Sequence, residues 1–210
     1  MIIGLLGNIG SGKGFASDYI QEKYGFTHLS FAESLKKAIS NIFGWEYELL
    51  KGSTKESREW REVVDVWWSN RLGIPNLTPR KVLQLWGTEV CRNHFHQDIW
   101  IASLERKLNR FSDENIIIDD CRFTNEITAL RNSNAKLIQI RRGSLPEWYD
   151  TAKRELEHLN ETGEMRIKYP NIHISEWGWI LEDFDHTIHN DSSKEDFEKA
   201  IDKIIRVSLI

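Results

Sequence analysis

Cysteine is scarce in this sequence, which has only Cys91 and Cys121 among its 210 residues. Their spacing matches no zinc-binding pattern, and two cysteines are too few for the disulfide framework of a small secreted protein. We therefore expect two reduced thiols, as in a cytoplasmic protein.

The sequence also lacks long apolar runs and an evident targeting signal. No stretch of about 18 apolar residues occurs, so we expect no membrane-spanning helix and no membrane partner. The first residues, Met1 to Gly4, carry no basic side chain and lead directly into an apolar segment, which argues against a signal peptide.

Basic residues are not in excess, because 32 Asp and Glu outnumber 28 Lys and Arg and give a net charge of −4. Proteins that coat nucleic acids are usually basic, so we expect no nucleic-acid polymer as a partner. With 40% hydrophobic and 29% charged residues, the composition is typical of a soluble globular protein. The length favours one domain, with room for an inserted subdomain.

Strand-like and helix-like segments alternate along the chain, which favours an α/β fold with a parallel sheet. The predicted strands cover residues 2–6, 27–31, 116–118, 137–140 and 187–188. The predicted helices cover residues 13–24, 34–43, 55–72, 79–95, 98–109, 126–132 and 145–162. A last helix is expected after a capping box formed by Ser192 and Glu195.

A glycine-rich turn connects the first predicted strand and helix. Gly7, Gly12 and Lys13 fit the pattern G-x-x-x-x-G-K, in which backbone N–H groups surround a phosphate and the lysine reaches its outer oxygens. The following helix adds the positive end of its dipole. The alternative is an ordinary glycine turn with a surface lysine, and the position between a strand and a helix argues against it.

Gly14 departs from this pattern, because a Ser or Thr usually follows the lysine and its hydroxyl binds Mg²⁺. Two interpretations stay open. Either water, phosphates and an acid elsewhere hold the metal, or the loop binds a nucleotide without turnover.

Two acids, Asp119 and Asp120, directly follow the apolar run of three isoleucines. A carboxylate at the carboxyl end of a strand beside a phosphate loop can hold Mg²⁺ or its water shell. We favour Asp120, which begins the polar run that ends at Glu126. The alternative for a single acid at this place is a helix cap.

Phosphoryl transfer develops negative charge, so several cations must converge on the reacting group. The candidates are Lys36, Arg80, Arg92, Arg122, Arg141 and Arg142. Arg122 is favoured because it follows a strand end, and the alternative for each arginine is a solvated surface charge. His94 and His96 are two residues apart, which favours a turn between helices over a metal site.

Taken in order, these motifs resemble the deoxynucleoside monophosphate kinases of tailed bacteriophages, a branch of the P-loop kinases. The matching stretches are Gly7 to Lys13, SFAESLKKAISNIFGWE (30–46), TPRKVLQLWGTEVCR (78–92), DIWI (98–101), IIIDDCRFTNE (116–126), HISE (173–176) and IHND (188–191). They extend over nearly the whole chain. The blocks at 78–92 and 120–126 are more specific than the glycine loop alone.

The resemblance implies the α/β fold of a three-layer P-loop NTPase, similar to nucleotide kinases, in a single domain over residues 1–210. A helical segment that binds the nucleoside monophosphate would cover residues 45–112, and a lid would cover about 141–172. The implied enzyme transfers the γ-phosphoryl group of ATP, with Mg²⁺, to a deoxynucleoside monophosphate for phage DNA synthesis. It would work in the cytoplasm, that of the host if a phage encodes it, and a homodimer is compatible with the resemblance.

The resemblance also implies roles for individual residues. ATP would bind to Gly7, Gly10, Ser11, Gly12, Lys13 and Gly14. The deoxynucleotide would contact Lys36, Arg80, Gln84, Trp86, Arg92, Trp100, Asp120, Arg122 and Glu126. The catalytic groups would be Lys13, Asp120, Arg122, Arg141 and Arg142, and Asp120 would also hold the metal.

Several alternatives stay open at this point. Trp86 and Trp100 could form a wall of the base pocket or simply pack in a core. The family's FADPLK is FAESLK here, with Glu33 and Ser34 in place of Asp and Pro. A P-loop kinase for another small phosphorylated acceptor, such as dephospho-coenzyme A, is a second candidate. A nucleotide-binding module without turnover is a third.

Overall fold

The computed structural model describes residues 1–158 and 163–208 and divides the chain into two compact units. The first unit comprises residues 1–30 and 110–210, and the second comprises residues 31–109. The second unit therefore begins earlier than the insertion expected at 45–112. The assignment of that insertion to monophosphate binding, and of 141–172 to a lid, stays a prediction.

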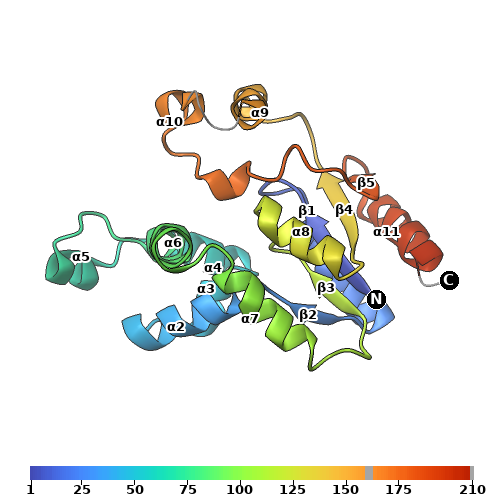
Figure 1. Ribbon diagram of the computed structural model, residues 1–210, viewed down its shortest axis with the longest axis horizontal. Helices are drawn as coiled ribbons and strands as arrows, with labels where there is room; N and C mark the ends of the chain where they lie inside the picture. The colour runs from blue at the N-terminus through green and yellow to red at the C-terminus, as the bar shows by residue number, and fades with distance from the viewer. Residues whose placement is uncertain (159–162, 209–210) are drawn as a thin grey trace. The chain divides into compact units, whose positions relative to one another are not determined.

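A five-stranded parallel sheet forms the centre of the first unit, in the order β2-β3-β1-β4-β5 (Figure 1). The strands are β1 (Ile2–Leu6), β2 (Thr27–Leu29), β3 (Ile116–Ile118), β4 (Lys136–Arg141) and β5 (His186–His189). The predicted parallel α/β sheet is thus confirmed, and the strands on either side of β1 come from the second half of the chain.

Helices cover both faces of this sheet and make three layers. On one face, α1 (Lys13–Tyr24) and α11 (Lys194–Ser208) share an apolar core with alternate residues of the strands. On the other face lies α8 (Thr124–Asn132), whose Leu130 leaves no room for a side chain at Gly4 of β1. The first unit also contains α9 (Tyr149–Glu157), α10 (Glu164–Lys168) and the short 3-10 helix η2 (Ile174–Glu176). The two central strands β1 and β3, which are covered on both faces, contain no polar side chain, whereas β2, β4 and β5 also carry polar residues.

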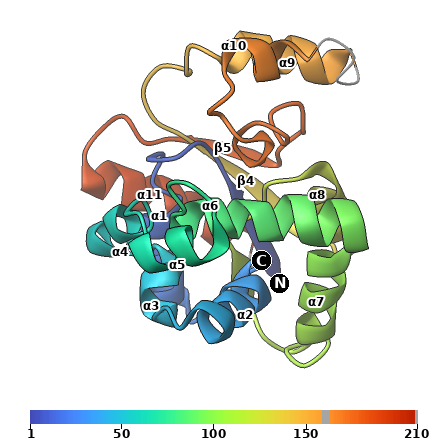
Figure 2. The same ribbon diagram turned by 90° about the vertical axis from the view of Figure 1, so that its left-hand side faces the viewer.

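The second unit is helical. It consists of α2 (Glu33–Phe43), α3 (Tyr47–Lys51), α4 (Lys55–Trp60), α5 (Val66–Leu72), α6 (Pro79–Gln84), the π-helix η1 (Leu85–Phe95) and α7 (Ile99–Leu108). Figure 2 shows α6 and η1 as one continuous rod. Its core joins Leu35, Ile39, Leu50 and Val82 with a group of aromatic rings. Phe43 and Trp45 stack with a distance of 4.5 Å between ring centroids.

The helix predicted at 55–72 is wrong as one element, since the chain forms α4 and α5 with a turn between them. Asp65 explains the interruption, because its Oδ1 accepts a hydrogen bond from Trp68 N at 2.9 Å and so starts a new helix. A capping box between Thr54 and Ser57 starts α4. The cap at Thr54 agrees with the predicted start, whereas the cap at Asp65 overrides the continuous helical pattern.

The cap predicted for the last helix is displaced by one residue. Ser193 Oγ, not Ser192, accepts from Asp196 N at 3.1 Å and donates to Asp196 Oδ2 at 2.9 Å. The helix predicted at 145–162 is also shorter. It begins only at Tyr149, after the turn in which Tyr149 N donates to Pro146 O, and the end of that prediction, 159–162, lies outside the described residues.

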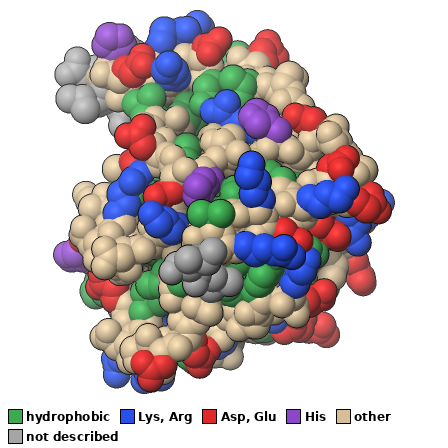
Figure 3. Space-filling model, turned by 90° about the vertical axis from the view of Figure 1, so that its right-hand side faces the viewer, with side chains coloured by type: hydrophobic (Ala, Val, Ile, Leu, Met, Phe, Trp, Pro, Cys, Tyr) green, Lys and Arg blue, Asp and Glu red, His purple; other side chains and the backbone are tan. Residues whose placement is uncertain are grey.

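Acidic and basic side chains are interspersed on the face shown in Figure 3, as the small net charge leads one to expect. Among the described residues, no helix has the length and hydropathy needed to cross a membrane.

Candidate active site

The carboxyl ends of the parallel strands bring the predicted phosphate-binding residues of the first unit to one edge of the sheet. The glycine loop follows β1, Ser30 follows β2, and Asp119 and Asp120 follow β3. Arg141 ends β4, and Asn190 follows β5. Ligands of open parallel sheets bind at this edge, next to the position where the strand order reverses, which here is β1.

Glycine is required at two positions of the loop. Gly7 has a φ of +148°, and a Cβ there would lie 2.3 Å from the carbonyl oxygen of Ile140. Gly12 has a φ of +108°, and its Cβ would lie 2.5 Å from Asn190 Nδ2. That amide donates to Ser11 O at 2.9 Å and holds the loop from β5. The loop is therefore a cradle that side chains at these positions would fill, which fits a bound phosphate chain.

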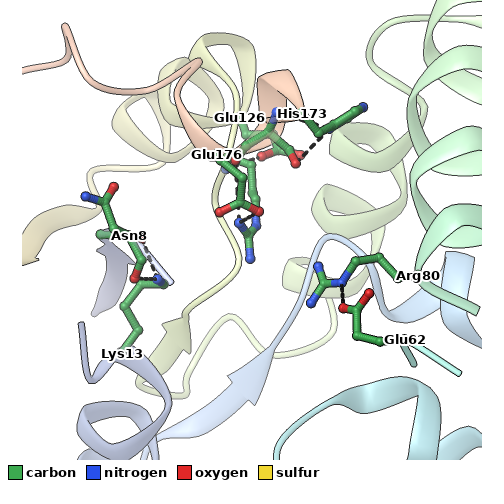
Figure 4. Close-up of polar contacts among 10 residues, drawn as sticks. Asn8, Lys13, Glu62, Arg80, Glu126, His173 and Glu176 are labelled. Carbon is green, nitrogen blue, oxygen red and sulfur yellow. Dashed lines mark hydrogen bonds and ion pairs between the residues drawn. The ribbon is translucent and has the colours of Figure 1, made fainter. Parts of the chain in front are cut away.

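Lys13 is the first residue of α1, and its ammonium group folds back over the loop. Its Nζ donates to Asn8 O at 3.0 Å and to Gly7 O at 2.5 Å (Figure 4). Burial, and next the positive charge of Arg122, lower the pKa of Lys13 from 10.5 to about 8, while Glu176 and Asp119 act in the opposite direction. The carbonyl oxygens of Gly7 and Asn8 thus hold the Lys13 ammonium group over the loop. Its buried charge is unfavourable without a ligand, and an anionic ligand would stabilise it.

Gly14 differs from Gly7 and Gly12. It has no positive φ, and a Cβ there would meet nothing within 4 Å. A hydroxyl would therefore fit, so the backbone does not explain its absence. Asp18 lies one turn further along α1 on the same face. Burial and the charge of Asp119 raise the pKa of Asp18, so Asp119 lies within electrostatic reach of this face.

Both acids after β3 are tied to the end of β2. Asp120 Oδ2 accepts from Ser30 Oγ at 2.6 Å, and Asp119 Oδ1 lies 2.8 Å from His28 Nε2. The charge of Asp119 also favours the charged form of Lys13 and so opposes the lowering of its pKa by burial and Arg122. The structure therefore adds Asp119 to the preferred Asp120 as a carboxylate near the loop, and oxygen donors of this kind suit Mg²⁺.

Glu126 holds the turn that carries Arg122. Its Oε2 accepts from Arg122 N at 2.7 Å and from Phe123 N at 3.2 Å, and it is buried at the start of α8. Glu126 thus caps the amino-terminal end of α8, and its negative charge interacts favourably with the positive end of the helix dipole. Through these two hydrogen bonds Glu126 shapes the backbone of its own turn. A contact with the deoxynucleotide stays a prediction.

The guanidinium of Arg122 has a partner that sequence reasoning missed. Arg122 Nη1 donates to Glu176 Oε1 at 3.0 Å and lies 3.5 Å from Ser175 O. Figure 4 labels Glu176 and also His173, which lies three residues before it in the chain. The sequence feature that could have pointed to Glu176 is the HISE stretch (173–176). This stretch is one of the matching blocks, but no role was assigned to it.

Arg141 and Arg142 line a pocket beside the loop, together with Asn8, Ser11, Tyr149 and Trp179. Arg141 Nε donates to Gln139 Oε1 at 2.8 Å, and Arg142 is exposed. Asn8 Oδ1 and Ser11 Oγ are buried here, and neither has a hydrogen-bond partner in the described part of the chain. These atoms are available to a polar ligand. Beyond the pocket, α9 and α10 lie side by side, and Met165 N donates to Glu155 Oε2 at 2.5 Å.

The remaining predicted residues belong to the second unit, where three cations have separate partners. Lys36 Nζ donates to Lys51 O at 3.3 Å, and Arg80 forms an ion pair with Glu62 (Figure 4). Arg92 is buried in η1 and donates to Gln97 O at 3.1 Å. Each cation is thus held at a helix end or a turn of its own unit.

The two tryptophans take part in core packing. The ring of Trp86 lies edge-on to Phe43, with 6.0 Å between their centroids. Trp100 Nε1 donates to Gly87 O at 2.8 Å, and both rings pack on the apolar core of the second unit. Gln84 ends α6 and is half-buried. A contact of these three residues with a base stays a prediction. Among residues 1–158 and 163–208 there is no cluster of three or more His, Cys, Asp or Glu side chains that could hold a metal ion. His94 lies in the last turn of η1, and His96 directly follows this helix.

A profile of the deoxynucleotide monophosphate kinase family matches residues 47–201. The chain belongs to this family. It is also 32% identical, over 171 residues, to a putative deoxynucleotide monophosphate kinase of Acanthamoeba polyphaga mimivirus. That match covers 75% of this chain and 81% of the relative. Members of the family are phosphotransferases, and the resemblance first noted in the motifs is confirmed.

Two further likenesses are weaker. A stretch of 58 residues is 41% identical to the deoxynucleoside-5'-monophosphate kinase of Escherichia phage T5 and covers 28% of this chain and 23% of that protein. In structure, the chain is similar to dephospho-CoA kinase from Campylobacter jejuni, with a TM-score of 0.46 and 16% identity over 98% and 95% of the two chains. A likeness at that level says nothing about the substrate.

Proposed function

We propose that the protein transfers the γ-phosphoryl group of ATP to deoxynucleoside monophosphates and produces deoxynucleoside diphosphates for DNA synthesis. The observation that carries this proposal is the meeting of the glycine loop, Lys13 and the Arg122 turn at one sheet edge. Membership of the family supports the class of acceptor.

For this phosphoryl transfer, the protein mainly has to position the two substrates and neutralise negative charge. The second pKa of a phosphate monoester is about 6, so the acceptor phosphate is mostly dianionic near pH 7 and needs no strong base. In phosphoryl transfer the protein aligns the groups and neutralises charge that spreads over the phosphoryl oxygens. Lys13 and Arg122 would supply this charge from the loop side, and Arg141 and Arg142 from the pocket.

The metal would be held from the acid side of the loop. Mg²⁺ prefers oxygen ligands and keeps several waters, so it does not depend on one hydroxyl. Asp119 and Asp120 would hold it or its water shell, and Gly14 would leave space for that water. Bound Mg²⁺ would neutralise charge on the phosphates of ATP.

The acceptor would be recognised by residues of the second unit. Lys36, Arg80 and Arg92 carry the charges that suit a monophosphate, and Gln84 can hydrogen-bond to a base. Trp86 and Trp100 would contribute the faces of their rings that the core leaves exposed. A lid over residues 141–172 would exclude water during the reaction.

The direct test is an assay with ATP, Mg²⁺ and each of the four deoxynucleoside monophosphates, with the matching ribonucleotides as controls. We expect a diphosphate product from at least one deoxynucleotide. Failure of all four would contradict the proposal. Dephospho-coenzyme A added to the same assay distinguishes the other acceptor class, because it would then be phosphorylated in their place.

Gly14 favours one further candidate, a module that binds a nucleotide without turnover. Calorimetry separates the two cases, since binding of ATP without any product would support the module. A Gly14→Ser variant adds a second comparison. If the wild type is active and the added hydroxyl brings no gain, other groups already hold the metal.

A further inference from the structure

Glu176 lies outside every predicted set of site residues, yet its carboxylate faces the two cations of the phosphate site. It ends η2, and only 14% of its side chain is exposed. Its Oε1 accepts from Arg122 Nη1 at 3.0 Å, and 31% of the Arg122 side chain is exposed. Charge-assisted hydrogen bonds of partly buried groups are strong and directional. The pair therefore restricts where the guanidinium points.

A local turn presents this carboxylate. Glu176 N donates to His173 O at 2.9 Å, and Ser175 N donates to His173 Nδ1 at 3.2 Å. The His173 ring thus caps η2 from its amino end, in the way that Ser or Asp side chains usually cap helices. Backbone and side chain together determine the direction of Glu176.

The turn is also fixed directly to the Arg122 segment. Thr124 Oγ1 donates to Gly178 O at 3.2 Å. A Cβ at Gly178 would lie 3.2 Å from Ile174 O and 3.4 Å from Arg122 O, so the two backbones are closely packed. The ion pair therefore connects two segments that are already held in place, and its loss would free the guanidinium without freeing the segments.

Glu176 also acts on Lys13 through its charge. Burial and Arg122 disfavour the ammonium form of Lys13, whereas Glu176 and Asp119 favour it. Two cations close to the loop thus face one partly buried carboxylate from the η2 turn. Incoming phosphates would bring the same kind of charge to the same place.

We propose that Glu176 is a positioning residue of the phosphoryl-transfer site, which orients the Arg122 guanidinium and balances the charges of Lys13 and Arg122 until phosphates bind. This inference rests on the proposed function. It has two opposite consequences. The orientation of Arg122 favours the chemical step, whereas the negative charge of Glu176 repels the phosphate chain.

Replacing Glu176 should therefore separate catalysis from anion binding. Glu176→Gln keeps the shape and removes the charge, so we expect kcat to fall on the order of tenfold because a weaker, neutral hydrogen bond orients the guanidinium less firmly. The same variant should bind inorganic tripolyphosphate, measured by calorimetry without Mg²⁺, about three- to tenfold more tightly because a repulsive charge is gone. Glu176→Asp keeps the charge but shortens the reach, so kcat should fall without tighter binding.

A matched control and a double variant exclude a merely structural effect. Glu198→Gln removes a carboxylate that pairs with Lys194 on α11, outside every segment assigned to the site, and it should leave both measurements unchanged. In an Arg122→Gln background, the effect of Glu176→Gln on kcat should disappear, because the partner that it orients is absent.

Three results would overturn the inference. These are an unchanged kcat of Glu176→Gln, weaker binding of tripolyphosphate by that variant, or a failure of both Glu176 variants to fold, as judged by thermal unfolding. The binding measurement uses no acceptor. A wild type that makes no diphosphate would therefore contradict the proposed function, while the tripolyphosphate comparison still decides whether Glu176 opposes phosphate binding.

Discussion

The two units hold their predicted site residues by different means. In the first unit, Lys13, Asp120 and Arg122 follow the carboxyl ends of adjacent parallel strands, so the backbone brings them to one edge. In the second unit, Arg80 and Trp100 depend on contacts between helices, with Glu62 and Gly87 as their partners. Backbone topology thus places the predicted residues of the first unit, whereas side-chain packing places those of the second. In the proposed function, ATP binds to the first unit, and the second unit supplies most of the predicted contacts with the acceptor.

The largest effect should come from Lys13→Ala, which removes the cation over the loop. We expect kcat/KM to fall on the order of 10²–10³-fold or more, because the developing charge loses a preorganised partner. A steady-state assay with ATP and the best deoxynucleotide measures this. Lys199→Ala, at an exposed ion pair with Asp196 on α11, is the control and should be neutral. Full activity of Lys13→Ala would break the assignment of ATP to the first unit.

A matched pair of glycine variants tests whether topology shapes the loop. In Gly7→Ala, the added Cβ meets the backbone of Ile140 at a φ that side chains rarely adopt, so ATP affinity should fall on the order of 100-fold or the fold should weaken by about 1–3 kcal/mol. In Gly14→Ala the added Cβ has no atom within 4 Å, so the ATP affinity and the stability of the fold should both stay near the wild-type values. Calorimetry and thermal unfolding measure them. Equal tolerance of the two substitutions would contradict the described loop geometry.

Arg80→Ala tests the role of the second unit in binding the acceptor. Loss of this guanidinium should raise KM for the deoxynucleotide roughly tenfold, because a charge-assisted contact to its phosphate is lost. KM for ATP should change less than twofold by the same reasoning. Initial rates with each substrate varied in turn show the split, and the exposed Arg71→Ala on α5 is the control. A larger change for ATP would reverse the roles of the two units.

The smallest effect concerns pH. The pKa of Lys13 is about 8 in the folded protein, where Arg122 opposes and Glu176 and Asp119 favour its charged form. The charged fraction then falls roughly fourfold between pH 7 and 8.5, so ATP affinity should weaken by a similar factor as the pH rises. Lys13→Arg keeps its charge over this range and should abolish the dependence. An affinity that rises with pH would contradict the depressed pKa.

Most of the fold could be predicted from the sequence, because apolar runs and glycine signals mark strands and helix ends directly. The parallel strands and the loop between β1 and α1 were predicted within a residue or two. The break between α4 and α5 was missed, since the side chain of Asp65 starts a separate helix in a segment whose helical pattern is continuous.

The residues of the candidate site likewise fall into those that the sequence reveals and those that it does not. Strand-end residues such as Asp120 and Arg122 are visible in the sequence, because parallel strands end at a common edge. Glu176 is not, since its position depends on a tertiary contact between η2 and the turn before α8. In the same way, the sequence could not show that Trp100 Nε1 is engaged by Gly87 O, because that contact arises from the packing of α7 on η1.

The central place of β1 has a consequence for the order in which a growing chain can fold. Ile2 pairs with Ile116 of β3, Leu6 pairs with Gln139 of β4, and the glycine loop is braced by Asn190 after β5. The strand β1 is thus completed by segments that are synthesised much later. Such distant pairings slow folding. We therefore expect a nascent chain to gain nucleotide binding only after β5 and Asn190 have been synthesised.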